Sequence, residues 1–291
     1  MKLKFAFVAI LFFITADSFS QPLSRKLKFS QGQELEVSMN VQTKIVQEAM
    51  GQSVDLNLDG NATHLFTVTN TTDDNSTLHH TMKRIFYSLE GFGPKQTFDS
   101  DKPKDMEGKL AKPIKELLGK TYDMVIDSTG RVMMALPEKI ETNYSDALLA
   151  MIMNLMKDLA GTIQPPKKND ASFFKVLPDT VAGLGDSWTE TVNNEGGKSS
   201  TVYKITGIND STVIVDFTGN SMTTSKAEMM GMETTTTMNN KYIGKIILDK
   251  STGIMRQKSS TTDSHGNTEV MGGTLPMTSK TTTVIDVKPK M

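Results

Sequence analysis

Histidine is the residue type in this chain best suited to bind a metal ion or to move a proton, and the sequence holds four. His79 and His80 are adjacent in a run that alternates like a strand. Neighbouring side chains of a strand point to opposite faces, so this pair is not expected to share one metal ion. His64 lies in another run, without a paired ligand pattern. We therefore expect no metal site and interpret the histidines as solvated surface residues.

Four oxygen-bearing or turn-forming residues have the spacing of the first half of a calcium loop: Asp55, Asn57, Asp59 and Gly60. The twelfth position of such a loop needs a glutamate, and here it is Phe66. Leu56 and Leu58 alternate with the polar residues, which is typical of a strand. The favoured interpretation is a strand that ends in a turn at Asp59 and Gly60.

The string Gly185–Ser187 is similar to the nucleophile block of a lipase and esterase family. A nucleophilic serine needs a histidine base that a carboxylate orients. His265 with Asp263 is the nearest candidate pair in the sequence, but its spacing is not that family's, and the family is α/β. A serine hydrolase acting through Ser187 is therefore the weaker alternative. We expect no catalytic residues here, and a strand start that packs Trp188 inward.

Methionine is unusually frequent, with 20 residues, and many cluster where a hairpin or helix could line a shared interior. Flexible, polarizable methionine side chains suit adaptable apolar surfaces. This favours a cavity for a lipid or another apolar ligand, although methionines that only fill irregular gaps under a twisted sheet would give the same composition. The candidate ligand-binding residues are Met151, Ile152, Leu155, Met156 and Trp188.

Alternation of apolar and polar residues is the dominant pattern of the chain. From Leu35 to Val41 every second residue is apolar, which predicts a strand with one buried face. Similar runs follow, and short turns between them imply antiparallel hairpins. The expected turns include Met50–Gly51, Asp59–Gly60, Ser128–Gly130, Asn209–Asp210, Ser251–Gly253 and His265–Asn267.

Two segments have helical periodicity. Pro113 to Leu118 predicts a short helix, because proline is tolerated in a first turn. The stronger segment runs from Ser145, a suitable N-cap, to Gly161, a suitable C-cap, with apolar residues at helical spacing. Pro165 to Asp170 then has the composition of a linker.

The chain also contains an internal duplication. Gly32 and Gly185 each precede a strand-like run, and Asp127–Gly130 and Asp249–Gly253 each mark a hairpin. A Glu-x-Met-Gly motif that predicts hairpin corners occurs at Glu48–Gly51, Glu228–Gly231 and Glu269–Gly272.

These motifs carry a resemblance to a known family. Together with Phe98–Asp101, Leu118–Lys120, Leu177–Pro178 and Gly185–Trp188, they resemble an exported Bacteroidota-type family that is catalogued as a domain of unknown function. The resemblance covers most of the chain after the leader. It implies an envelope location and a β-rich fold, and it brings no catalytic residues.

We predict a mainly β protein with a large antiparallel curved sheet or open barrel built from two related halves. One long helix (about 145–160) is expected to pack on that sheet. The predicted divisions are a signal peptide at 1–20, a first β-rich half at 21–160, a linker at 161–175 and a second β-rich half at 176–291.

The amino-terminal residues have the composition of a cleavable signal peptide. Lys2 and Lys4 precede an apolar run from Phe5 to Ile14, and small residues follow at Ser18 and Ser20. The apolar run is short of the ~20 residues that span a bilayer, so no stable transmembrane anchor is expected. A retained leader acting as an anchor is the alternative.

Composition excludes several classes of protein. The chain has no cysteine, so it can form neither a disulfide framework nor a thiolate metal site. Its formal net charge of −1 lacks the electrostatic footprint of a nucleic-acid-binding protein. We expect no cofactor and no nucleic-acid partner.

The leading hypothesis is a non-catalytic exported envelope protein that binds an apolar or amphipathic ligand, such as a lipid, in the concavity of its sheet. The alternative is a structural or protein-interaction module whose partner is another envelope protein. Either protein is expected in the periplasm or outside the cell.

Cleavage after Ser20 is expected to leave Gln21 as the first residue of the exported protein. Amino-terminal sequencing of the protein recovered from its native host checks this expectation. A cytosolic product that keeps its first twenty residues would contradict it.

Overall fold

A computed structural model describes most of the chain. The described residues are Leu23, 25–49, 52–91, 93–108, 111–140, 161–180, 183–194, 196–229, 232–270 and 273–290. The first half contributes the strands β1 (Glu34–Ala49), β2 (Gln52–Thr71), β3 (Asn75–Gly91), β4 (Gly93–Asp99), β5 (Thr121–Asp127) and β6 (Val132–Leu136). The second half contributes β7 (Ser187–Asn194), β8 (Gly197–Ile208), β9 (Thr212–Met229), β10 (Met232–Asp249), β11 (Met255–Val270) and β12 (Gly273–Pro289).

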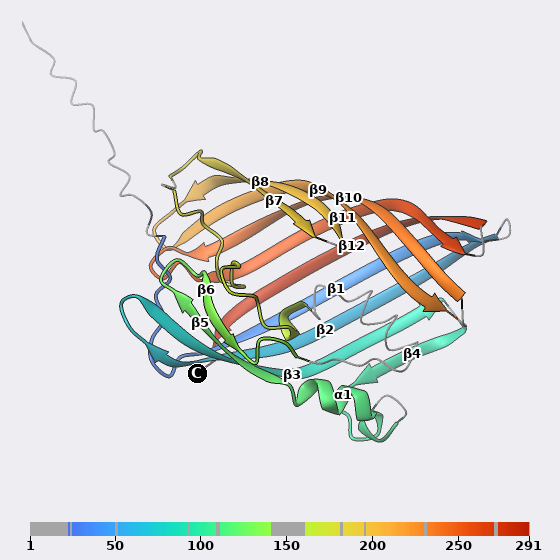
Figure 1. Ribbon diagram of the computed structural model, residues 1–291, viewed down its shortest axis with the longest axis horizontal. Coiled ribbons are helices and arrows are strands. Elements are labelled where there is room, and N and C mark those ends of the chain that lie inside the picture. The colour runs from blue at the N-terminus through green and yellow to red at the C-terminus, as the bar shows by residue number, and fades with distance from the viewer. Residues whose placement is uncertain are drawn as a thin grey trace, which may run out of the picture.

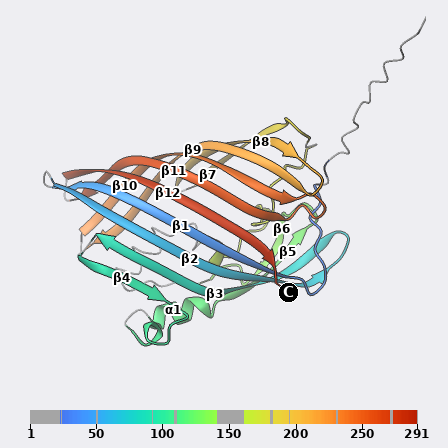
Figure 2. The same ribbon diagram turned by 180° about the vertical axis from the view of Figure 1, so that it is seen from behind.

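All twelve strands belong to one antiparallel sheet. Its order is β6-β5-β3-β2-β1-β12-β11-β10-β9-β8-β7, with β4 paired to β3 beside this path. Each half is thus a meander, and the two meanders join where β1 pairs with β12. The sheet curves into a trough whose two edges are β6 and β7, and residues 161–180 lie between them (Figures 1 and 2). The prediction of a large curved antiparallel sheet is confirmed.

Alternation along the strands separates a concave face from a convex face. On β1 the side chains of Leu35, Val37, Met39 and Val41 are buried in the concavity, and the polar residues between them point outward. The same alternation on β2 buries Leu56 and Leu58 and points their acidic neighbours outward. Burial of these apolar side chains at ~25 cal/mol per Å² is the main stabilisation of the sheet.

The Met and Gly positions of the three Glu-x-Met-Gly motifs lie outside the described residues, but the strands that flank each motif are described. The strands on either side of each motif pair up to its edge, with Ala49 opposite Gln52, Met229 opposite Met232 and Val270 opposite Gly273. Each motif therefore stands between two adjacent antiparallel strands. All three lie at the same end of the trough, because β1, β9 and β11 run in one direction.

The turns predicted at Asp59–Gly60 and His265–Asn267 are wrong, because these residues lie within strands β2 and β11. Gly60 is in the middle of β2, opposite Val41 of β1. Gly266 is in the middle of β11, where a Cβ atom would lie 1.9 Å from the carbonyl oxygen of Thr237 and 2.8 Å from Sδ of Met238. Position 266 therefore needs glycine because two strands approach closely there, and not because the chain turns.

The duplicated turns hold the amino-terminal segment at the other end of the trough. The backbone N–H of Leu27 donates to the carbonyl of Ser128 (2.7 Å), and that of Lys28 donates to the carbonyl of Thr252 (2.9 Å). Asp127 and Asp249 organise the two turns by accepting backbone hydrogen bonds from residues within them. The segment before β1 thus connects equivalent turns of the two halves.

Helix contributes little to the described part of the chain. The helix predicted from Pro113 is confirmed as α1 (Ala111–Leu118), which begins two residues earlier and buries Ala111, Ile114 and Leu117. The long helix predicted at about 145–160 falls outside the described residues and stays a prediction. Short 3-10 turns occur at η1 (Asp105–Glu107) and η2 (Gly161–Ile163). Within the described ranges, no helix combines the length and apolar character needed to cross a membrane.

The concave face of the second half has an apolar end and a hydroxyl-rich end. Near the turns that hold the amino-terminal segment, the inward side chains are Ile205, Val213, Val215, Ile246, Leu248, Ile285 and Val287. Further along the same strands, the inward positions are Thr201, Ser221, Thr223, Asn240, Thr262, Ser264, Ser279 and Thr281. Hydrogen bonds such as Asn240 Nδ2 to Ser221 Oγ (2.9 Å) connect these polar side chains across strands.

The turn at Gly130 offers a test of the contact with the amino-terminal segment. Gly130 and Gly185 both have φ near +90°, but a Cβ atom at Gly130 would lie 2.8 Å from Cδ1 of Leu27 and 3.0 Å from Cβ of Lys175, whereas Gly185 has open space. We expect Gly185→Ala to lower the free energy of unfolding by about 1–2 kcal/mol through backbone strain alone. Gly130→Ala should cost about 1–3 kcal/mol more through the clash.

Urea denaturation of the two variants measures the difference, with Gly185→Ala as the matched control. Equal losses of stability would show that Leu27 does not pack against the turn as described.

Candidate ligand cavity

A cavity of about 350 Å³ lies between the concave face of the sheet and residues 162–176. Strands β1, β7, β8, β10, β11 and β12 form one wall, and residues 162–176 form the other. This volume falls within the ~300–1,000 Å³ that is typical of small-molecule sites. The lining residues are Met39, Thr162, Ser172, Phe173, Lys175, Val176, Glu190, Tyr203, Ile246, Met255, Lys258, Ser260, Thr283 and Ile285.

Strand register gives the sheet wall of the cavity a polarity. One row across the strands consists of Met39, Ile285, Lys258 and Ile246. The next row, two residues further along each strand, contains Thr283 and Ser260 side by side. The cavity therefore lies where the apolar end of the concave face meets its hydroxyl-rich end.

Aromatic rings form a continuous stripe across the floor beside the cavity. Trp188 stacks on Tyr203 with ring centroids 5.1 Å apart, Tyr203 lies 5.8 Å from Phe217, and Phe217 lies 6.5 Å from Tyr242. The stripe crosses β7, β8, β9 and β10 and begins at the open edge of the sheet. Such rings present a large and rigid apolar surface.

Two glycines let these rings lie flat. Gly244 is opposite Phe217, and Gly219 is opposite Tyr242, on the concave face. A Cβ atom at Gly244 would lie 2.3 Å from the Phe217 ring, and one at Gly219 would lie 2.6 Å from the Tyr242 ring. Each ring thus occupies the space that a side chain on the neighbouring strand would otherwise fill.

The two lysines of the cavity wall have different surroundings. Nζ of Lys258 lies 5.4 Å from the centroid of the Phe217 ring, within cation–π distance. Nζ of Lys175 forms an ion pair with Asp179 (2.6 Å) and donates to the carbonyl of Thr129 (3.2 Å). Hydrogen bonds from Lys175 and Arg131 lower the pKa of Asp179 to about 2, so this partner stays ionised. The charge of Lys175 is therefore compensated within the protein.

Glu190 and Tyr203 form the side of the cavity next to the edge strand. Burial, followed by the negative charge of Glu190, raises the pKa of Tyr203 above its ordinary value. The phenol therefore stays protonated and keeps a hydroxyl that can donate a hydrogen bond.

The hydroxyl of Ser172, a residue of the outer wall, lacks a hydrogen-bonding partner among the described residues. The residue is 4% exposed, and its buried Oγ makes no hydrogen bond with the described part of the chain. A buried hydroxyl without a partner costs about 1–3 kcal/mol. Because this oxygen is inaccessible from the cavity, the cost falls on the packing of the wall.

Aromatic contacts hold the outer wall of the cavity in place. Phe173 stacks on Phe66 of β2 at 5.9 Å, and Phe174 packs edge-on against the same ring at 5.1 Å. The Tyr122 hydroxyl of β5 donates to the carbonyl of Thr162 (3.1 Å). The segment 161–175, predicted as a linker, thus also packs into the trough.

Two histidines form a buried pair that the sequence analysis missed. Nδ1 of His64 lies 3.0 Å from Nε2 of His80, both residues are fully buried, and Tyr122 stacks on His80 at 4.4 Å. The prediction of solvated surface histidines is therefore wrong for these two. The β2–β3 hairpin brings them together, because Phe66 is opposite His80. The turn between β2 and β3 is the feature of the sequence that could have indicated this pair, because the turn fixes the register of the two strands.

The opposite orientation of His79 and His80 is confirmed. His79 points outward and forms an ion pair with Asp123 (2.8 Å), while His80 points inward. Among the described residues, no group of three or more histidine, aspartate or glutamate side chains could hold a metal ion.

The role of the five predicted residues in ligand binding stays a prediction. Trp188 points into the concavity, as predicted, and its stacking on Tyr203 places it next to the cavity wall. Met151, Ile152, Leu155 and Met156 fall outside the described residues. Lys258, Ser172 and Tyr203 line the cavity but were not proposed, because only the pairing of strands distant in sequence brings them to one wall.

The residues of the hydrolase alternative lie far apart. Ser187 is at the start of β7 and His265 is on β11, with β8, β9 and β10 between them. At about 4.8 Å per strand, this separation is much longer than a hydrogen bond. Asp55, Asn57 and Asp59 alternate on β2 and do not form a loop.

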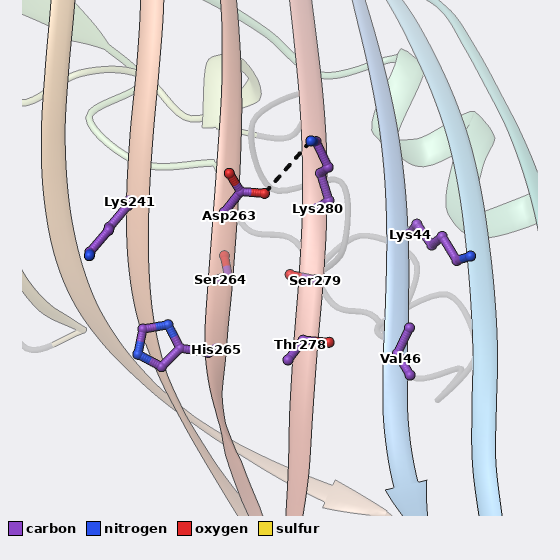
Figure 3. Close-up of a pocket in the computed structure, with 9 residues that line it drawn as sticks. All are labelled: Lys44, Val46, Lys241, Asp263, Ser264, His265, Thr278, Ser279 and Lys280. Carbon is purple, nitrogen blue, oxygen red and sulfur yellow. Dashed lines mark ion pairs between the residues drawn. The ribbon is translucent and has the colours of Figure 1, made fainter.

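A second hollow of about 420 Å³ lies on the convex face, across β1, β12, β11 and β10 (Figure 3). Its wall carries Lys44, Lys241, Lys280, His265 and Asp263. Lys280 and Asp263 are paired at 4.0 Å with side chains 67% and 71% exposed. Such exposed pairs are screened by water and salt, so the interior cavity is the stronger candidate site.

The chain is similar in sequence to one family of unknown function and, weakly, in backbone structure to several solved proteins. The sequence model of a family of unknown function, DUF6263, matches residues 73–255. No curated protein matches the chain. Lipovitellin, in a structure reported for its lipid–protein interactions, is 13% identical to this chain at a TM-score of 0.46. The match covers 91% of this chain but only 26% of the lipovitellin chain. An outer membrane channel of Pseudomonas putida F1 is 8% identical at a TM-score of 0.25, with 90% of this chain and 98% of the channel covered. Both TM-scores are too low for a functional argument.

The buried histidine pair should make stability depend on pH. Burial, with smaller contributions from His64 and His79, lowers the pKa of His80 from 6.5 to about 3. The folded protein holds His80 neutral, whereas the unfolded chain protonates it below pH 6.5. The free energy of unfolding is therefore highest above pH 6.5 and decreases as the pH falls toward 3. The steepest loss is about 1.4 kcal/mol per pH unit.

Urea denaturation between pH 7 and pH 4.5 measures this slope. His80→Gln should reduce it, whereas His79→Gln, at the exposed neighbouring position, should leave it nearly unchanged. An unchanged slope in His80→Gln would contradict the assignment.

Proposed function

We propose that this chain, which belongs to the family of unknown function DUF6263, is a non-catalytic envelope protein that binds an amphipathic ligand in its interior cavity. The observation that carries the proposal is a cavity of about 350 Å³ whose lining combines apolar side chains with hydroxyl groups and charged groups. An apolar cavity alone can stay empty, whereas polar groups on the cavity wall favour an occupant that forms hydrogen bonds with them.

The two walls of the cavity support a ligand with apolar and polar parts. Met39, Ile246, Ile285 and Phe173 offer apolar contacts to a chain or ring. Hydroxyl groups and charged groups on the same walls offer hydrogen bonds that fix its orientation.

The chemistry of the walls favours binding over catalysis. Among the described residues that line the cavity, none is a histidine, so no imidazole is present there to activate a serine or threonine. The envelope location rests on the signal-peptide composition of the leader, and the amino-terminal sequence of the exported protein tests it separately.

The single tryptophan of the chain provides a direct assay. Trp188 stacks on Tyr203 of the cavity wall, so ligand entry should change its fluorescence. Titration with the neutral probe N-phenyl-naphthylamine is expected to show saturable binding. Ser260→Phe fills the cavity from β11 and should weaken that binding by about tenfold or more, a change of about 1.4 kcal/mol.

Ser259→Phe is the matched control, because the neighbouring side chain on β11 points to the convex face, opposite Lys245. It should bind the probe like the parent protein. Mass spectrometry of protein purified from its native host should also detect a bound amphiphile. Protein free of ligand that does not bind the probe would contradict the proposal and favour a protein-interaction module.

A further inference from the structure

In the described chain, β7 ends the sheet, and one side of its backbone pairs with no other strand (Figure 1). The N–H of Ile205 on β8 donates to the carbonyl of Asp186 (2.9 Å), so residue 186 turns its carbonyl toward β8. Backbone groups alternate in direction along an antiparallel pair. The N–H and C=O groups that point to the free edge are therefore those of Ser187, Thr189, Thr191 and Asn193. Across the ranges that the structure describes, no backbone hydrogen bond from a neighbouring loop reaches these groups.

The side chains of β7 are exposed as well. Every residue from 187 to 193 except Trp188 is exposed, and the apolar Val192 is 53% exposed. β7 pairs with β8 without a bulge, and its sequence contains neither proline nor lysine. Bulges, prolines and lysines are features by which proteins protect an edge strand from further pairing. An edge strand of eight residues without them is suited to accept another strand.

The opposite edge of the sheet, in contrast, is protected by the chain itself. The N–H of Val132 on β6 donates to the carbonyl of Asp170 (2.9 Å), and the carbonyl of Val132 accepts from the N–H of Asn169 (2.7 Å). Arg131 forms a further bridge with Ala171. The pairing of β6 with β5 also shifts in register. The protein thus covers one edge of its sheet and leaves the other accessible.

We propose that the free edge of β7 binds an extended segment of another protein, which joins the sheet as one more antiparallel strand. In this mode of recognition, main-chain hydrogen bonds supply affinity, and the side chains opposite the edge supply specificity. The proposal goes beyond the proposed function and does not depend on the ligand cavity.

The side chains of β7 define the chemistry of the segment. Glu190 carries the only charge of β7, and the Tyr203 phenol beside it is neutral, so a lysine or arginine opposite Glu190 is favoured. Trp188 and Val192 flank Glu190 on the same face and favour apolar residues opposite them. The other face carries threonines, which favour threonine or another small polar residue. The segment is therefore expected to alternate small polar residues with apolar residues and one basic residue.

A second copy of this chain is a less suitable occupant. Pairing of β7 with itself, centred on Glu190, would place two carboxylates opposite each other. The remaining strands of the second copy would also have to continue the curve of the trough toward residues 161–180, which lie between its edges (Figures 1 and 2). A single strand, in contrast, adds only about 4.8 Å to the width of the sheet.

Four synthetic peptides test the docking site. The first has the sequence Thr-Val-Thr-Lys-Thr-Val-Thr with blocked ends, which can place its lysine opposite Glu190, and the second has glutamate in place of lysine. We expect the lysine peptide to bind about fivefold more tightly than the glutamate peptide, as followed by Trp188 fluorescence.

The other two peptides are N-methylated forms of the lysine peptide. N-methylation of the two threonines beside the lysine removes N–H groups that face β7, and it should weaken binding about tenfold or more. N-methylation of the two valines, whose N–H groups point away from β7, is the matched control and should have little effect.

Variants of β7 test the same edge from the side of the protein. Glu190→Lys should reverse the preference, so that the glutamate peptide binds more tightly. Thr191→Pro removes an N–H that points to the free edge and should weaken the lysine peptide about tenfold, whereas Thr191→Val keeps this N–H and should bind like the parent. Proline is tolerated at such an edge position, because the N–H that it removes makes no bond to β8.

Amide hydrogen exchange, measured by NMR, locates the bound peptide. The N–H groups of Thr189 and Thr191 should exchange more slowly when the lysine peptide is bound, whereas those of Glu190 and Val192 point to β8 and should change little. Slower exchange at the first pair, together with the preference for lysine, supports the proposal.

Three results would overturn the proposal. The first is equal binding of all four peptides, and the second is unchanged exchange at Thr189 and Thr191 in the presence of saturating peptide. The third is a parent protein that sediments as a dimer with these two N–H groups already protected, because the occupant of the edge would then be a second copy. All three are measured on the parent protein, so they remain decisive even where a variant does not fold.

Discussion

The pairing of β1 with β12 is the contact on which the rest of the structure depends. It runs from Leu35 opposite Pro289 to Gln47 opposite Met277, and it joins strands from opposite ends of the chain. Each half otherwise forms a meander of nearby strands, so this pairing is what makes the two concave surfaces one. The cavity lies across the joint, because Met39 belongs to β1 and Ile285 belongs to β12. Closing so long a loop is entropically costly, and the long register of hydrogen bonds and buried side chains offsets that cost.

The sequence predicts local structure well and long-range neighbours poorly, for a physical reason. Alternation depends on which face a side chain occupies, so the strands and tight hairpins could be read directly from residue type. Gly266 was misjudged because its requirement comes from Thr237 and Met238 on another strand. His64 and His80 were placed at the surface for the same reason, since their burial depends on a hairpin register. The cavity residues on β8, β10 and β11 were missed because no local pattern distinguishes an inward lysine from an outward one.

The hydroxyl-rich part of the concave face is the feature least typical of a protein interior. Buried hydroxyl groups cost free energy unless they are hydrogen-bonded, and here many are bonded across strands, as in Thr43 with Thr281 (3.1 Å) and Thr201 with the Tyr242 hydroxyl (2.7 Å). This part of the sheet is therefore stable without close apolar packing. Such a lining leaves polar surface beside the cavity, which an interior filled only by apolar side chains could not offer.

Residues 162–176 contribute both to the wall of the cavity and to the packing between the two halves of the sheet. Phe173 and Val176 line the cavity, and neighbouring Phe174 is fully buried against Phe66 of the first half. The same segment also bonds to β6, where the N–H of Val132 donates to the carbonyl of Asp170. A ligand that contacts this segment and the sheet together would stabilise both, because binding to the native state alone shifts the folding equilibrium. The residues that form the outer wall of the cavity therefore also contribute to the packing that holds the two halves together.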